Sequence, residues 1–188
     1  MDLIPNTFYH IYNRGNNRGK IFFEKENYYF FLRKYKKDVL LFCSPLAYCL
    51  MPNHFHFLFY FDSDEQIAKF KKTFSKLLSS YTRACNNRYN RTGSLFQIRT
   101  KSKCLDEQQA FCCFHYIHQN PVKARLTQSF EDWSFSSYND YCGLTDDSMV
   151  SKEDAYQLLD IPENKEAFLR QSKDVVVNEV VLKSLFLD

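Results

Sequence analysis

The chain has 188 residues and a net charge of +3; 45% of its residues are hydrophobic and 25% charged, with only four glycines and five prolines. This composition supports one domain with a full hydrophobic core and excludes a low-complexity disordered protein. Because no run approaches 18 apolar residues, the sequence also excludes a membrane span and a membrane partner. The N-terminus lacks the regions of a signal peptide, and the seven cysteines form no C-x-x-C pair, so we expect a cytoplasmic protein with reduced thiols.

The first third of the chain predicts a strand, a helix and a second strand. Residues 8–13 predict the first strand, and the arginines and glycines of residues 14–19 predict either an ordinary surface turn or a loop that contacts phosphate. Residues 24–41 carry an apolar stripe opposite a lysine-rich face, which predicts a helix. Residues 46–61 predict the next strand, in which Pro52 is acceptable only at an edge or a bulge.

The middle of the chain predicts two further helices separated by a strand. Ser63 and Gln66 form a capping-box pattern that opens a long helix with apolar side chains on one face. Residues 94–101 alternate as a half-buried strand does. Asp106 then begins a helix that must end near Pro121. Strands and helices in this order predict an α+β fold, an antiparallel sheet with helices packed on it.

Charge is distributed unevenly along the chain. Residues 1–145 carry 20 Lys and Arg against 12 Asp and Glu, residues 146–188 carry 5 against 10, and residues 66–105 hold ten basic side chains and no acidic one. This asymmetry favours nucleic acid as partner over an ordinary solvated helix face. We expect a functional domain over 1–145 and an acidic helical C-terminal appendage over 146–188. The side chains expected to contact DNA are Arg14, Arg18, Lys69, Lys72, Lys76, Arg83, Arg88, Arg99, Lys101 and Lys103.

Two histidines stand two residues apart in the apolar run of residues 46–61. Side chains at such spacing share one face of a strand, so His54 and His56 can offer two nitrogens to one divalent cation. Simple packing is the alternative for an isolated H-x-H pair. A structural zinc site would need a fourth protein ligand that the sequence does not offer. We expect His10, alone on its strand, to be a packing residue.

Tyr116 and Asn120 stand four residues apart on one helix face. With His54 and His56, the Asn120 oxygen would form an incomplete ligand set that suits Mg²⁺ or Mn²⁺. A phenol is a poor nucleophile at neutral pH, but a cation bound to a phosphodiester would make its phosphorus easier to attack. This predicts a phosphoryl-transfer site with Tyr116 as nucleophile, against the alternative that Tyr116 is one more buried aromatic residue.

Five segments, residues 14–18, 51–56, 93–97, 116–124 and 133–138, resemble motifs of the single-tyrosine HUH transposases, most closely the REP-associated tyrosine transposase branch. The resemblance covers roughly residues 5–142. It implies a ferredoxin-like sheet with His54 and His56 on a central strand, and Tyr116 as the nucleophile on single-stranded DNA. Asn120 stands where related insertion-sequence enzymes often have Gln. Because such proteins occur as monomers and as dimers, a homodimer is possible.

The resemblance implies a metal-dependent transposase that cleaves and rejoins single-stranded DNA through a 5′-phosphotyrosine intermediate and recognises hairpin or repeat DNA. Two alternatives remain. One is a non-catalytic module that binds single-stranded nucleic acid without a metal and forms no covalent adduct. The other is a replication or conjugation nickase with the same chemistry.

Overall fold

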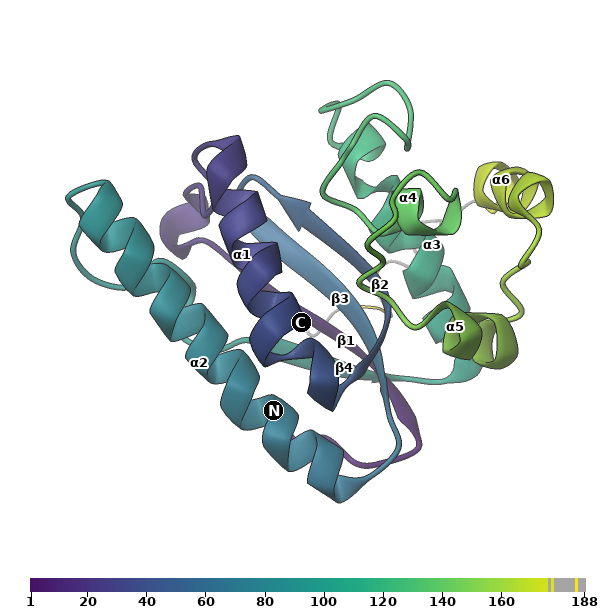
Figure 1. Ribbon diagram of the computed structural model, residues 1–188, viewed down its shortest axis with the longest axis horizontal. Coiled ribbons are helices and arrows are strands. Elements are labelled where there is room, and N and C mark those ends of the chain that lie inside the picture. The colour runs from purple at the N-terminus through teal and green to yellow at the C-terminus, as the bar shows by residue number, and fades with distance from the viewer. Residues whose placement is uncertain (176, 178–184, 186–188) are drawn as a thin grey trace.

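A four-stranded antiparallel sheet forms the centre of the protein (Figure 1). The computed structural model describes residues 1–175, 177 and 185. The strands are β1 (Thr7–Arg14), β2 (Ser44–Met51), β3 (His54–Phe61) and β4 (Lys101–Leu105). Their order is β2-β3-β1-β4, and all neighbouring pairs are antiparallel. The predicted α+β class and its ferredoxin-like sheet are therefore confirmed.

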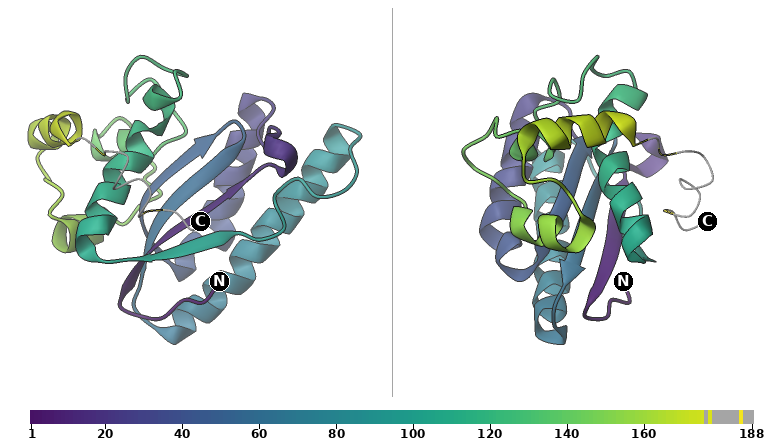
Figure 2. Two further views of the ribbon diagram at one scale, coloured as in Figure 1. Left: turned by 180° about the vertical axis from the view of Figure 1, so that it is seen from behind. Right: turned by 90° about the vertical axis from the view of Figure 1, so that its right-hand side faces the viewer.

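Helices cover both faces of this sheet (Figures 1 and 2). The helices are α1 (Lys25–Asp38), α2 (Asp64–Arg88), α3 (Glu107–Lys123), α4 (Tyr138–Tyr141), α5 (Lys152–Leu159) and α6 (Lys165–Asp174), with 3-10 turns η1 (Asn16–Arg18) and η2 (Leu40–Phe42). Helices α1 and α2 lie on one face, whereas α3 lies on the other with α4, α5 and α6 beside it. No helix in the described part of the chain combines the length and apolar character needed to cross a bilayer.

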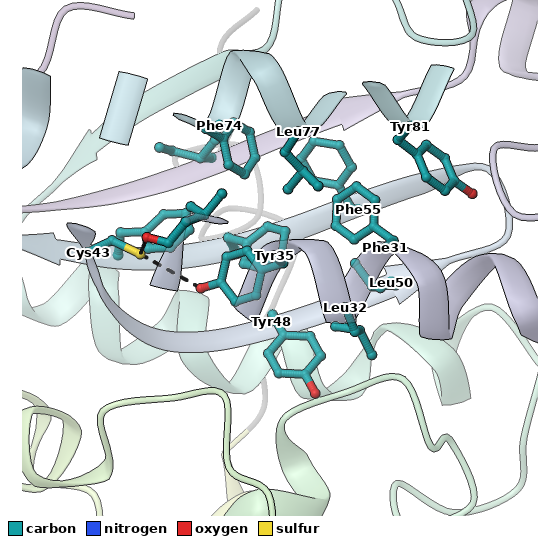
Figure 3. Packing of buried hydrophobic residues seen from close by; sticks show 14 of the residues in the cluster. Phe31, Leu32, Tyr35, Cys43, Tyr48, Leu50, Phe55, Phe74, Leu77 and Tyr81 are labelled. Atoms are coloured by element: carbon teal, nitrogen blue, oxygen red, sulfur yellow. Dashed lines mark hydrogen bonds between the residues drawn. The ribbon is translucent and has the colours of Figure 1, made fainter. Parts of the chain in front are cut away.

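The larger core lies between the sheet and helices α1 and α2. Side chains alternate along β3, so Phe55 and Phe57 point to this face. Phe55 meets Phe31 of α1 and Phe74 of α2 (Figure 3). Phe57 meets Tyr35 of α1 and the same Phe74. Most of the ring pairs are tilted or perpendicular, as aromatic quadrupoles prefer. This packing fixes β3 at the centre of the sheet.

A second core lies between the opposite face of the sheet and α3. Leu58 of β3 packs here with Phe114 and Ile117 of α3. Among the described residues of the acidic C-terminal part, α5 and α6 are helical, and they add Leu159 and Phe168 to this core. The division of the chain at residue 145 stays a prediction, and residues 176, 178–184 and 186–188 lie outside the described part of the chain.

Two of the predicted strands are wrong. Residues 46–61 form a hairpin of two strands, because Pro52 and Asn53 make the turn between β2 and β3. Residues 94–101 are irregular up to β4, which begins only at Lys101. Their alternation is not a sign of half-burial, because Ile98 is 98% exposed. The predicted helices are confirmed, although the first ends at Asp38 and α3 continues to Lys123.

The central aromatic packing predicts a large loss of stability on truncation of Phe57. This side chain is 0% exposed, so Phe57→Ala should lower the free energy of unfolding by about 3–5 kcal/mol. Ile98→Ala is the matched control at a solvent-exposed apolar position and should change it by less than about 0.5 kcal/mol. Chemical denaturation measures both. Equal effects of the two substitutions would contradict the assignment of Phe57 to the core.

Candidate active site

The two histidines of β3 lie on the face of the sheet that α3 covers. His54 is opposite Arg14 of β1, and His56 is opposite Tyr12. The imidazole ring centroids of His54 and His56 are 4.9 Å apart. The shared face that was expected from their spacing is therefore confirmed. They lie on a central strand of the sheet, between β1 and β2.

Helix α3 brings Tyr116 to this pair of histidines. The helix begins with a capping box in which the Asp106 side chain accepts from the Gln109 backbone and the Gln109 side chain accepts in return. The Tyr116 ring lies 5.5 Å from the His56 ring, centroid to centroid, at 76°. One pocket is lined by Tyr12, Asn13, Arg14, His54, His56, Gln97, Arg99, Lys101 and Tyr116. The two motifs are thus parts of one site.

Both histidines of this pocket are suited to ligate a cation. Burial, with the charge of Arg14, lowers the pKa of His54 to about 4, and burial also holds the pKa of His56 well below its usual value. Both rings are therefore neutral at pH 7, the form that binds metals. His54 Nδ1 donates to Asn53 Oδ1 at 2.6 Å, which leaves the lone pair on Nε2. Within the described residues, no group of three or more His, Cys, Asp or Glu side chains could hold a metal.

Tyr116 needs activation before it can act as a nucleophile. Burial raises the pKa of its phenol, while the Asn120 side chain and the charge of Arg14 act in the opposite direction. The Lys123 ammonium group lies 5.7 Å from the centroid of the Tyr116 ring. A neutral phenol in a pocket with cationic side chains can attack a phosphodiester only if charge on the phosphate is neutralised at the same time.

Asn120 lies directly below Tyr116 on α3. It is 8% exposed, and its Nδ2 donates to the Tyr116 backbone carbonyl at 2.9 Å. It is not one of the residues that line the pocket. Its place next to Tyr116 follows from the helical spacing, whereas its role as a ligand stays a prediction.

Nine of the ten predicted DNA-contacting side chains fall into two groups. Arg14, Arg99 and Lys101 line the pocket, and Lys103 follows on the same face of β4. Arg18 is exposed in η1.

The other five predicted DNA-contacting side chains are exposed on α2, which lies on the opposite face of the sheet (Figure 1): Lys69, Lys72, Lys76, Arg83 and Arg88. Of these, Lys69 pairs with Glu65 and Arg88 with Glu24. The structure therefore does not bring the α2 group to the pocket.

One residue of this site makes a contact that the sequence did not predict. His10 was expected to be a packing residue, and it is indeed buried, but its Nε2 lies 2.9 Å from Nδ1 of His56. A usable signal was present, because His10, Tyr12 and Arg14 alternate along β1 and must share a face. Asn53 and Gln97 were not predicted as site residues either: Asn53 accepts a hydrogen bond from His54, and Gln97 lines the pocket.

Comparisons with known proteins agree with this fold. The family model described as "Transposase IS200 like" matches residues 4–120. Among solved structures, the chain is similar to a REP-associated tyrosine transposase bound to a REP hairpin, with a TM-score of 0.56 and 18% sequence identity, over 80% of this chain and 94% of that chain. At this identity the likeness shows the fold. The comparison with curated proteins finds no match.

Proposed function

Because the chain belongs to the IS200-like transposase family, we propose that it is a metal-dependent enzyme that cleaves and rejoins single-stranded DNA through a 5′-phosphotyrosine intermediate. The observation that carries this proposal is the place of Tyr116. Its ring lies beside His56, in one pocket with His54 and three cationic side chains, Arg14, Arg99 and Lys101. The pocket thus combines a phenol nucleophile, two neutral imidazoles that can ligate a cation, and positive charge that can stabilise the transition state.

Tyr116 would attack the phosphorus of a phosphodiester through its phenol oxygen. The bond from tyrosine to phosphorus forms, and the bond from phosphorus to the 3′ oxygen of the upstream nucleotide breaks. The phenol proton passes to solvent, and the leaving oxygen takes up a proton to become a free 3′-OH. The downstream strand stays linked to Tyr116 through its 5′ phosphate. Attack by a 3′-OH on this linkage reverses the step and rejoins DNA without another energy source.

His54 and His56 would hold a Mg²⁺ or Mn²⁺ ion in this pocket, with Asn120 as the third ligand. When bound, the ion withdraws charge from the phosphate and stabilises the charge that builds up during the attack. The amide NH₂ of Asn120 is held by the Tyr116 carbonyl, so the side-chain oxygen is the atom that a cation would take. The same hydrogen bond fixes the position of this third ligand relative to the backbone of Tyr116.

We further propose hairpin or repeat DNA as the substrate. The similar solved protein is bound to a REP hairpin. In the pocket of this chain, Arg14, Arg99 and Lys101 supply charge for phosphates, and the aromatic ring of Tyr12 offers a surface for an unpaired base. Stacking of that kind contributes roughly 1–3 kcal/mol per base, which favours DNA that is already unpaired beside a hairpin.

Salt dependence of binding separates the two groups of basic side chains. Each phosphate contact in a single-strand complex contributes about 0.7 to the slope of log K against log salt, so the double variant Arg99→Gln, Lys101→Gln should lower the slope by about 1.4. The double variant Lys72→Gln, Lys76→Gln removes the same charge from exposed positions on α2 and should change the slope less. Fluorescence anisotropy with labelled single strands measures both. An equal or larger change for the α2 pair would place the DNA on the other side of the sheet.

The proposal is tested by incubating the protein with labelled hairpin DNA and Mn²⁺, followed by denaturing gel electrophoresis. A covalent adduct, which resolves to joined product when a DNA 3′-OH is supplied, supports the proposal. Binding that needs no metal and gives no adduct would support a non-catalytic module instead. Cleavage through an adduct that never rejoins would support a nickase.

A further inference from the structure

His10 connects the candidate metal ligand His56 to the C-terminal part of the chain. It lies on β1, two residues before Tyr12, the residue that faces His56 across the sheet. The rings of His10 and His56 are nearly parallel, with an interplanar angle of 24° and centroids 5.0 Å apart. His10 Nε2 and His56 Nδ1 are 2.9 Å apart. This is a hydrogen bond between two buried imidazoles, so one must donate and the other must accept.

The direction of this hydrogen bond follows from the other nitrogen of His10. His10 Nδ1 lies 2.9 Å from the backbone carbonyl oxygen of Leu185, 175 residues further along the chain. A carbonyl oxygen can only accept, so the proton of His10 is on Nδ1. His10 is fully buried, which favours the neutral imidazole, and a neutral imidazole carries one N–H. His10 Nε2 is therefore the acceptor, and His56 Nδ1 is the donor.

The consequence for His56 concerns its second nitrogen. If Nδ1 of a neutral imidazole carries the proton, Nε2 carries the lone pair, which is the atom that ligates a metal. His54 reaches the same state by a different route, because its Nδ1 donates to the Asn53 amide. Each of the two histidines thus has its own acceptor, and both present Nε2 as the ligating atom.

We propose that His10, held by the Leu185 carbonyl, is a positioning residue that fixes His56 in the Nδ1–H tautomer and so presents its Nε2 to the divalent cation. This inference rests on the proposed function, since it assigns a role toward the metal of that site. Through the Leu185 carbonyl, the C-terminal part of the chain would also help to orient a metal ligand. Two further contacts hold this part against α3: Gln119 Nε2 donates to the Val175 carbonyl at 2.8 Å, and Lys123 Nζ to the Val177 carbonyl at 3.4 Å.

Two variants of the full-length protein separate positioning from simple packing. His10→Leu fills the space but removes the acceptor, whereas His10→Gln keeps an acceptor oxygen within reach of His56 Nδ1. Mn²⁺ affinity, measured by calorimetry or by electron paramagnetic resonance, should fall about 10–100-fold in His10→Leu, the usual effect of losing such a partner. His10→Gln should keep most of the affinity. His115→Leu removes a buried imidazole outside the candidate site and is the matched control, with affinity as in the wild type.

The tautomer of His56 is read directly in the metal-free wild type from long-range ¹H–¹⁵N correlation spectra of the imidazole. We expect a protonated Nδ1 and an unprotonated Nε2. A protonated Nε2 would overturn the inference, and so would wild-type Mn²⁺ affinity in His10→Leu or equal losses in His10→Leu and His10→Gln. Absence of Mn²⁺ binding in the wild type would instead contradict the proposed function, while the tautomer would still be measured.

Discussion

Replacing Tyr116 with phenylalanine should lower the yield of the covalent DNA adduct by at least about a thousandfold, because the substitution removes the oxygen that attacks phosphorus. Binding of single-stranded DNA should stay within a small factor of the wild type. The substitution keeps the aromatic ring next to His56, and the cationic side chains that line the pocket are untouched. Adduct yield on a denaturing gel and affinity by fluorescence anisotropy give the two readouts.

Tyr60→Phe is the matched control for this substitution. Tyr60 lies on β3, on the same face as His54 and His56, but at the other end of the strand, where its hydroxyl contacts only Asn6 at 3.5 Å among the described hydrogen bonds. Removal of that hydroxyl should leave adduct formation unchanged. Undiminished adduct yield in Tyr116→Phe would show that another group attacks the phosphate.

Loss of the divalent cation should also lower adduct formation strongly. Chelation with EDTA should lower adduct formation by at least about a hundredfold, because a metal ion contributes several kcal/mol of charge stabilisation in the transition state. Addition of Mn²⁺ or Mg²⁺ should restore it. His56→Ala should show the same loss even with Mn²⁺ present, because it removes one of the two imidazoles that line the pocket among the described residues.

His115→Ala is the control for this second prediction, since His115 is also a buried histidine but lies among Phe111 and Phe114 of α3. It should keep metal-dependent adduct formation. Adduct formation that persists in EDTA, or in His56→Ala at wild-type yield, would contradict the assignment of the metal site.

Local spacing was sufficient to predict the shared face of His54 and His56 and the placement of Tyr116 above Asn120. Side chains two residues apart on a strand share a face, and side chains four residues apart on a helix are neighbours, so the spacing alone predicts both contacts. The hairpin at Pro52 was missed, because both strands are buried and their apolar residues form one continuous run. The alternation of residues 94–101 was misleading, since it includes Ile98, which is exposed.

Relations between distant parts of the chain could not be predicted from spacing. The contact of His10 with His56 depends on the register of β1 against β3, and its contact with Leu185 joins residues 175 positions apart. The basic residues between 66 and 105 lie on both α2 and β4, so counting them together does not separate the two faces of the sheet. Lys101 of β4 lines the pocket, whereas α2 covers the opposite face. Sequence distance contains no information on which layer a charge occupies.

We expect Tyr116 to become covalently linked to DNA, and peptide mapping of the adduct tests this most directly. The wild-type protein is incubated with hairpin DNA and Mn²⁺, digested with protease and nuclease, and examined by mass spectrometry. We predict a 5′-phosphonucleotide on the peptide that contains Tyr116, together with a released strand that ends in a 3′-OH. A modification on any other residue, or cleaved DNA without a covalent peptide, would contradict this account.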